Sequence, residues 1–234
     1  MSEARASISF VLPMFNEKDN IDHTVDVIAA LARETCDDYE IIIVDDCSTD
    51  GSGQIVDRMA QRDPAIRPVH LERNTKFGGA YAEGFRRASK DLIVYLDSDL
   101  PVRSADIRQS LPLIAEADIV TGCSRIEKGD TLKRKVISGA YNFLVERLFG
   151  LGVADINSGY KVVRRELVRD LNFRSQSPFV NVELFIHARR KNGRVVQFPL
   201  VFLSRPAGRS RITTLPVILA TAADMLRVWL ANKA

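Results

Sequence analysis

The sequence predicts an α/β protein with a mostly parallel central sheet flanked by helices. Two observations carry this prediction. Short apolar runs alternate with stretches of helical periodicity, and this alternation is typical of a parallel, doubly wound core. Runs such as "EIIIV" and "LIVYL" are apolar throughout, as strands covered on both faces of a sheet are.

The candidate strands follow one another at 8–13, 39–45, 66–71, 92–97 and 118–123, with another near 194–203. A helical pattern fills each gap between the first five. After residue 124 the pattern is irregular, and we expect helices at 131–149, 181–192 and 214–231. A length of 234 residues favours one large domain. We expect this domain to span 1–212, with 213–234 forming a C-terminal amphipathic helix and no transmembrane domain.

Composition narrows the class of protein. With 46% hydrophobic and 27% charged residues, the chain is typical of soluble globular proteins. Cys36, Cys47 and Cys123 lack metal-ligand spacing, which favours a reducing compartment. The start "MSEARAS" has no apolar signal-peptide core, so we expect a cytoplasmic protein.

The net charge of +3 hides an asymmetry between the two halves. Residues 1–117 hold 13 Lys and Arg against 21 Asp and Glu, whereas residues 118–234 hold 20 against 9. A basic half attracts phosphate groups, an anionic membrane or nucleic acid, and a solvated surface without a partner is the alternative. Of these partners we do not expect nucleic acid.

Polar residues follow the first four candidate strands. Asp97 and Asp99 come directly after "LIVYL", at the carboxyl end of a strand, where open α/β sheets bind ligands. An exposed turn is the alternative for this pair taken alone. The other strand-end residues favour the ligand-binding reading, and they are Asn16, Glu17, Asp45, Asp46 and Asn74.

Several linked motifs give the chain a family resemblance. The segments "VLPMFNEKDNI", "IIIVDDCSTDGS", "NTKFGGAYAEGF", "YLDSDLP" and "DINSGYKVVRREL" stand in this order. They resemble family 2 glycosyltransferases, which have a nucleotide-diphosphosugar transferase fold of the GT-A type. The later "GCSR" and "SRPAGRSRI" are most similar to polyprenyl-phosphate sugar transferases of the dolichyl-phosphate mannose synthase kind.

The resemblance implies a donor site at the strand ends. Asp97 and Asp99 would bind Mg²⁺ or Mn²⁺, because paired carboxylates are hard ligands that hold a metal against a diphosphate. Four positions depart from the family pattern: Phe15 replaces Tyr, Lys76 replaces Gly, Arg211 replaces the more common Lys, and Pro101 replaces a Gln that can help to bind the metal. The implied donor-nucleotide residues are Pro13, Phe15, Glu17, Asp45, Asp46, Lys76, Gly79, Asp97 and Ser98.

The basic half is the candidate acceptor side. A phosphate monoester is largely ionised at neutral pH, so it needs orientation and charge stabilisation more than a general base. Guanidinium groups supply both through paired hydrogen bonds. The implied catalytic residues are Asp99, Arg125 and Asp155, and the implied phosphate or acceptor residues are Arg125, Arg134, Ser158, Glu183, Arg205 and Arg211.

The predicted function is an inverting, metal-dependent transfer of a sugar, mannose or glucose, from a GDP- or UDP-sugar to a polyprenyl phosphate. One alternative is transfer to a hydroxyl group of a glycan or small molecule, with Asp155 as the base. Another is a nucleotide-sugar-binding module without turnover, for which Pro101 is the argument. A dehydrogenase is disfavoured because no Gly-x-Gly-x-x-Gly motif follows the first strand.

The C-terminal tail has an apolar stripe at helical spacing, and its residues are Leu215, Ile218, Leu219, Ala222, Met225, Leu226, Trp229 and Leu230. The helix is too short and too charged for a convincing membrane span. Three environments remain open for the stripe: the membrane interface, the protein core, or a homodimer contact. Clustered Lys and Arg in "TLKRKVISGAYNFLVERLFG" make that segment a second candidate for contact with the cytoplasmic face of a membrane.

Overall fold

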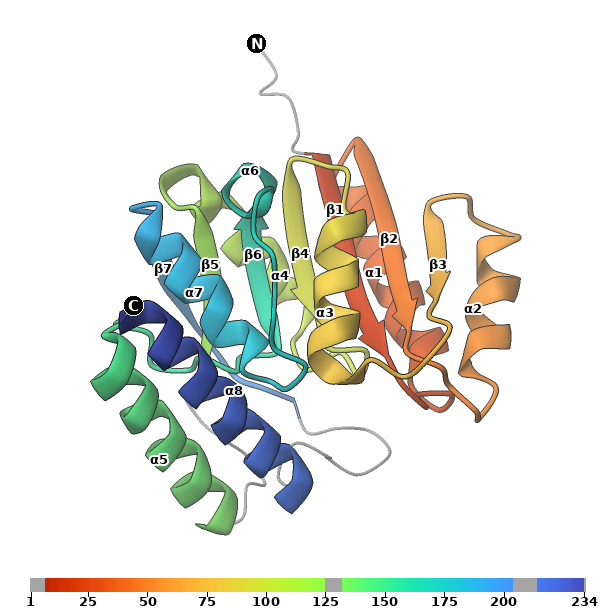
Figure 1. The fold of residues 1–234 in the computed structure, drawn as a ribbon. Coiled ribbons are helices and arrows are strands. Elements are labelled where there is room, and N and C mark those ends of the chain that lie inside the picture. Colours follow the sequence, from red (N-terminus) through yellow and green to blue (C-terminus); the bar gives the residue numbers. More distant parts are fainter. Residues whose placement is uncertain (1–6, 125–131, 204–213, 234) are drawn as a thin grey trace.

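The computed structural model of the chain describes residues 7–124, 132–203 and 214–233. For residues 132–135 and 233 it describes the backbone and not the side chains. Its strands and helices alternate from the start of the first range (Figure 1). In chain order the elements are β1 (Ser7–Met14), α1 (Ile21–Thr35), β2 (Asp38–Asp45), α2 (Ser52–Ala60), β3 (Ile66–His70), α3 (Lys76–Arg87), β4 (Leu92–Leu96), α4 (Ser104–Ser110), the 3₁₀ helix η1 (Leu111–Glu116), β5 (Ile119–Ser124), α5 (Leu132–Phe149), β6 (Tyr160–Arg164), α6 (Arg165–Val168), α7 (Val180–Arg190), β7 (Val195–Leu200) and α8 (Leu215–Lys233).

The described strands form one seven-stranded sheet in the order β3-β2-β1-β4-β6-β5-β7. All neighbouring pairs are parallel except those of β6, which runs antiparallel to both β4 and β5. The carboxyl ends of six strands therefore lie at one edge of the sheet, and β6 begins at that same edge. The mostly parallel sheet flanked by helices is as the sequence predicts.

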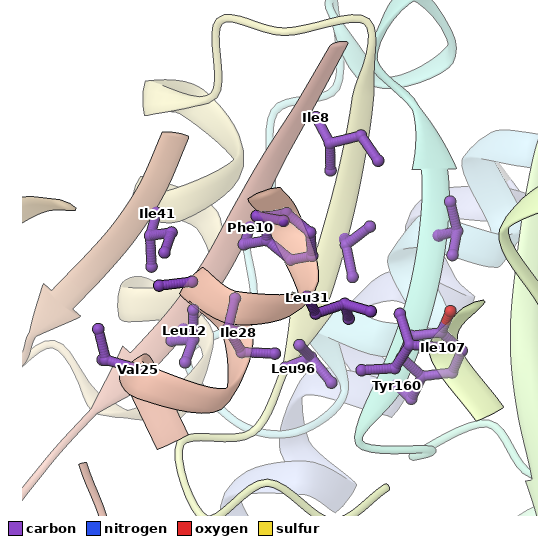
Figure 2. Close-up of a cluster of buried hydrophobic side chains, with 14 of the residues drawn as sticks. Ile8, Phe10, Leu12, Val25, Ile28, Leu31, Ile41, Leu96, Ile107 and Tyr160 are labelled. Atoms are coloured by element: carbon purple, nitrogen blue, oxygen red, sulfur yellow. The ribbon is translucent and has the colours of Figure 1, made fainter. Parts of the chain in front are cut away.

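Helices cover both faces of the sheet and bury two apolar clusters (Figure 1). Along β1 the side chains alternate, so that Phe10 and Leu12 meet α1 while Val11 meets α3. Figure 2 shows the first cluster, in which Val25 and Ile28 of α1 lie against the strand residues. Their spacing of three residues keeps them on one face of the helix.

Strand β6 was not among the strands expected from the sequence. Its "YKVVR" pairs in register with β4, from Leu96 opposite Tyr160 to Leu92 opposite Arg164. The first five expected strands are all present within a residue or two of their predicted bounds, and β7 lies inside the expected 194–203. The inserted β6 brings residues 155–159 to the edge where β4 ends.

Helices α5 and α8 lie side by side in Figure 1 and carry most of the exposed large apolar side chains. Phe143 is 72% exposed and Leu215 is 68% exposed. The others on these helices are Val136, Leu144, Leu219, Leu226 and Leu230. Leu203, which follows β7, is also exposed. The apolar stripe predicted for the tail is thus largely outside the core, with Met225 as its buried member.

Asp224 fixes α8 to the rest of the chain. Its side chain is buried, accepts a hydrogen bond from the Ser177 backbone N–H at 3.2 Å, and pairs with Arg227 at 2.8 Å. The charge that interrupts the apolar stripe in the sequence is therefore one of the contacts that hold the helix, together with the buried Met225.

Candidate active site at the carboxyl edge of the sheet

Asp97 and Asp99 follow β4 in a turn that is held from several sides. The Tyr95 hydroxyl donates a hydrogen bond to Asp97 Oδ1 at 2.6 Å, and the Asp97 N–H donates to the Gly159 carbonyl at 3.1 Å. Thr24 of α1 donates its hydroxyl to the Ser98 carbonyl at 2.9 Å. Ser98 is buried, whereas the two aspartates are half-buried, so the turn is rigid and its carboxylates reach the surface.

Asp45 and Asp46, at the end of β2, make hydrogen bonds to different parts of the chain. Asp45 accepts the Ser48 N–H at 2.9 Å through Oδ1, and its Oδ2 lies 3.1 Å from His70 Nδ1. His70 Nε2 lies 2.8 Å from Asp57, and this carboxylate, helped by Asp45, raises the pKa of His70 above its usual value. Asp45 thereby ties β2 to the end of β3.

Asp46 holds the loop before α3. Its Oδ1 accepts both the Thr75 N–H, at 2.5 Å, and the Thr75 hydroxyl, at 2.9 Å. Burial raises the pKa of Asp46, and the hydrogen bonds from Thr75 oppose that effect. The predicted contacts of Asp45 and Asp46 with a nucleotide remain predictions beside these loop contacts.

The loop after β1 is tied to the loop after β2. Asn16 has a left-handed backbone (φ 57°), donates its N–H to Ser48 Oγ at 2.9 Å, and accepts the Thr49 N–H at 2.8 Å. Glu17 donates its N–H to Ser52 at 2.9 Å. Phe15 is half-buried, and Pro13 pairs with Val44 in the sheet. The predicted nucleotide residues of β1 and β2 thus lie at one edge.

Two glycines at the start of α3 are sites of close packing. A Cβ on Gly78 would lie 2.2 Å from the Ser175 carbonyl oxygen, and the Gly78 N–H donates to Gln176 at 2.9 Å. A Cβ on Gly79 would lie 2.4 Å from Thr75 Cβ. Lys76, where the family pattern has Gly, has the left-handed φ of 65° that glycine adopts most readily. Packing therefore accounts for Gly78, while donor contacts of Lys76 and Gly79 stay predictions.

The residues before β6 lie against the aspartate turn of β4. A Cβ on Gly159 would stand 2.4 Å from Asp97 Oδ2, so only glycine permits this approach. Ser158 is buried and donates its N–H to the Asp155 carbonyl at 3.3 Å. Asp155 and Ser158, predicted on the acceptor side, are thus brought next to the predicted metal ligands.

Lys161 belongs to the motif "DINSGYKVVRREL", but the sequence prediction gave it no role. It is 0% exposed, donates from Nζ to the Ser158 carbonyl at 2.5 Å, and lies 5.5 Å from the centre of the Tyr95 ring. Burial lowers the pKa of Lys161 to about 8, and the negative charges of Asp97 and Asp155 oppose that effect. The available signal was a lysine inside the apolar run of "YKVVR".

Glu183 of α7, predicted near the acceptor, is buried and holds a neighbouring loop. It accepts the Arg174 N–H at 2.8 Å and the Ser175 hydroxyl at 2.6 Å. This loop is the one that packs on Gly78 of α3. Glu183 therefore supports the start of α3, and its contact with an acceptor stays a prediction.

The predicted phosphate-binding arginines fall outside what the structure describes: Arg125, Arg205 and Arg211 entirely, and Arg134 in its side chain. Other arginines of the basic half stabilise the fold. Arg164 donates to the carbonyls of Ile114 and Ala117, at 2.6 and 3.0 Å, and Arg189 donates to Gly150 at the end of α5, at 2.7 Å. Part of the positive charge is thus structural.

Asp97 and Asp99 fit a divalent metal that a bound substrate helps to hold. Among the described residues no group of three or more His, Cys, Asp or Glu is arranged to hold a metal ion. Mg²⁺ and similar ions are usually bound by one or two carboxylates together with substrate phosphates and water, and two carboxylates on a rigid turn meet that need. Pro101 supplies no ligand, so the remaining positions would belong to the donor and solvent.

Comparison with solved structures confirms the GT-A type fold. Glucosyl-3-phosphoglycerate synthase from Mycobacterium tuberculosis, in complex with Mn²⁺, UDP-glucose and phosphoglyceric acid, superposes with a TM-score of 0.74 at 24% identity. The match covers 97% of this chain and 79% of that one.

Curated relatives include two enzymes named for a lipid phosphate. Undecaprenyl-phosphate mannosyltransferase of Micrococcus luteus is 27% identical, over 87% of this chain and 86% of its own length. Undecaprenyl-phosphate 4-deoxy-4-formamido-L-arabinose transferase of Yersinia enterocolitica is 30% identical, over 81% of this chain. Glycosyltransferase AglD of Haloferax volcanii is 30% identical over 97% of this chain. The chain spans only 58% and 37% of the latter two.

A family model supplies the assignment. The model of "Glycosyl transferase family 2" matches residues 9–171, from β1 through the aspartate turn of β4 to the residues after β6. These are the segments that build the edge described above. The chain belongs to glycosyl transferase family 2.

Proposed function

We propose that this glycosyltransferase moves a hexose, mannose or glucose, from a GDP- or UDP-sugar to a polyprenyl phosphate, with inversion at the anomeric carbon. The observation that carries the proposal is the contact between two loops. The aspartate turn after β4 is hydrogen-bonded through Asp97 to Gly159 in the loop before β6, the loop that contains Asp155 and Ser158. Two relatives named for undecaprenyl phosphate support the class of acceptor.

Each loop has a part in the proposed reaction. The loops after β1 and β2, with Phe15, Glu17, Asp45 and Asp46, receive the nucleotide. Asp97 and Asp99 hold Mg²⁺ or Mn²⁺, which when bound supplies positive charge for the departing nucleoside diphosphate.

The acceptor needs no strong base. An oxygen of the lipid phosphate attacks the anomeric carbon while the bond from that carbon to the diphosphate oxygen breaks, and the phosphate is already ionised. Asp155 and Ser158 orient this acceptor, and Arg125, Arg134, Arg205 and Arg211 neutralise its charge and that of the diphosphate.

The acceptor also suggests a role for the exposed face of α5 and α8. One helix in the described part of the chain, α8, has a stretch long and apolar enough to cross a membrane, Leu215–Asn232, of which 17% is buried. We propose that residues 213–234, beyond a catalytic unit of 1–212, lie along the lipid surface instead, with the exposed side chains of α5, such as Phe143, beside them. The protein would then work as a peripheral enzyme on the cytoplasmic face, where the lipid phosphate is presented.

Transfer of label from donor to lipid tests the proposal. Purified protein is incubated with radiolabelled GDP-mannose or UDP-glucose, Mn²⁺ and undecaprenyl phosphate in detergent, and then extracted with organic solvent. Label in the organic phase, lost in excess chelator, supports the proposal. Label on a hydrophilic acceptor would instead favour transfer to a hydroxyl group, and donor binding without product would indicate a binding module.

A further inference from the structure

Lys161 is unusual among the charged residues of this chain. It is the only lysine or arginine that is fully buried among the residues whose side chains the structure describes. Its ammonium group lies over the rings of Tyr95 and Phe185, both buried, so its stem lies in the apolar cluster on that face of the sheet. Lysine is rarely buried without compensation, because removing an ammonium group from water is costly.

The compensation comes from the two loops of the candidate active site. Nζ donates to the Ser158 carbonyl at 2.5 Å, lies over the rings of Tyr95 and Phe185 at 5.5 and 5.9 Å, and is attracted by Asp97 and Asp155. The ammonium group is therefore bonded to the loop before β6 and attracted to the acid of the β4 turn.

The loop that Lys161 holds is the one that touches Asp97. Gly159 has no side chain, but its carbonyl accepts the Asp97 N–H at 3.1 Å and its Cα faces Asp97 Oδ2. Ser158 and Asp155 are part of the same turn. The position of these acceptor-side residues relative to the metal ligands depends on how firmly the turn is fixed.

We propose that Lys161 is a positioning residue, which clamps the turn at 155–159 against Asp97 so that acceptor and donor meet in the reactive alignment. The inference rests on the proposed function and assigns a role in it to a residue that does not touch substrate. Partners of this kind, placed behind ligating or reacting groups, commonly contribute about 10–100-fold to activity or metal affinity.

The test is Lys161→Met, which keeps an unbranched chain of similar length and removes the charge and the hydrogen-bond donor. We expect kcat for sugar transfer to fall about 10–100-fold. Binding of Mn²⁺ alone, followed by electron paramagnetic resonance, should be unchanged or tighter, because removal of a nearby positive charge cannot weaken attraction of a cation to Asp97 and Asp99. Hydrogen exchange of a peptide covering 155–160 should become faster, and that of a peptide covering 38–46 should not.

Two control variants separate positioning from general destabilisation. Lys191→Met makes the same chemical change at an exposed ion pair with Asp170, and should leave kcat, Mn²⁺ binding and exchange unchanged. Glu40→Gln perturbs a buried charge near the amino end of β2, so it should lower the melting temperature without lowering kcat.

The outcomes are distinguishable. If the parent protein transfers sugar and Lys161→Met retains kcat within about twofold, the positioning role is wrong. Loss of Mn²⁺ binding together with a collapsed melting temperature would make Lys161 a structural residue and also overturn the inference. If the parent transfers no sugar, the proposed function fails, and unchanged hydrogen exchange at 155–160 in the variant would still refute the clamp.

Discussion

Buried charge is arranged in opposite ways at two places in the sheet, around Glu40 of β2 and at the end of β4. Near the amino edge, Glu40 of β2 is 3% exposed and surrounded by donors: Ser9 Oγ at 2.6 Å, Ser89 N and Oγ at 2.7 and 2.8 Å, and Arg67. Burial would raise the pKa of Glu40, but these hydrogen bonds outweigh it and the pKa is lowered.

At the end of β4, on the carboxyl edge, the arrangement is reversed. Asp97 and Asp99 are half-buried, and the fully buried charge is the cation Lys161 behind them. Glu40 is enclosed by donors and stabilises the fold, whereas Asp97 and Asp99 have a buried cation behind them and are partly open to solvent. Burial alone therefore does not identify a functional charge; the direction in which its partners lie does.

Asp99→Asn should have the largest effect on activity. The amide keeps the shape of the side chain at the end of β4 but loses the charge that a divalent ion needs, so we expect transfer to fall on the order of 10³-fold or more. The melting temperature should be close to that of the parent. Activity of the variant near the parent level at saturating Mn²⁺, or activity of the parent in excess chelator, would contradict the metal role.

Glu40→Gln should have the largest effect on stability. The amide has only one acceptor oxygen, so its NH2 group must face either the donors Ser9 and Ser89 or the guanidinium of Arg67. We expect a loss of about 1–3 kcal/mol in the free energy of unfolding, measured with urea, and no loss of kcat in the folded enzyme. If Asp99→Asn and Glu40→Gln lower stability and activity in the same ratio, the contrast between Glu40 and the aspartates after β4 is wrong.

Gly78→Ala should disturb the carboxyl edge through packing instead of charge. The new methyl group would meet the backbone of Ser175 at 2.2 Å, and we expect a destabilisation of about 1–3 kcal/mol as the loop held by Glu183 moves away. Gly139→Ala on α5 is the matched control, because a Cβ there meets nothing within 4 Å. The control should stabilise the chain by about 0.5–1 kcal/mol. Equal effects of the two changes in urea unfolding would exclude the packing explanation.

The smallest expected effect is a pH dependence from His70, which lies between Asp57 and Asp45. The raised pKa means that the folded state binds the proton more tightly than the unfolded chain. The stabilisation is therefore complete below the unfolded pKa, near ~6.5, and is lost as pH rises through the higher folded pKa. Because the side chain is 46% exposed, we expect less than about 1 kcal/mol.

Urea unfolding of the parent and of His70→Gln between acidic and alkaline pH measures this term. The stability advantage of the parent should shrink as pH rises. An advantage that grows with pH would show that the imidazole is held in its neutral form.

The sequence predicted the strands of the sheet better than it predicted the residues that hold the candidate site in place. Short, mostly apolar runs predicted β1 to β5, and the acids that follow two of them, Asp45, Asp46, Asp97 and Asp99, lie at the strand ends as predicted, because both signals are local. Strand β6 was missed because "YKVVR" is short and contains charges, and its pairing with β4 depends on residues some 70 positions away. The residues that hold the acids come from other elements, as Thr24 and Thr75 do, and no local pattern reveals them.

The reversed direction of β6 has a consequence for how such an enzyme can diversify. Strand β5 ends at Ser124 and β6 begins at Tyr160 on the same edge of the sheet, so both ends of the intervening chain are attached at that edge. Its length and composition are therefore not constrained by the strand pairings. The segment that includes α5 therefore has both attachment points at the carboxyl edge, and exchanging it between relatives should change the exposed apolar surface of α5 while the ends of β1, β2 and β4 stay the same.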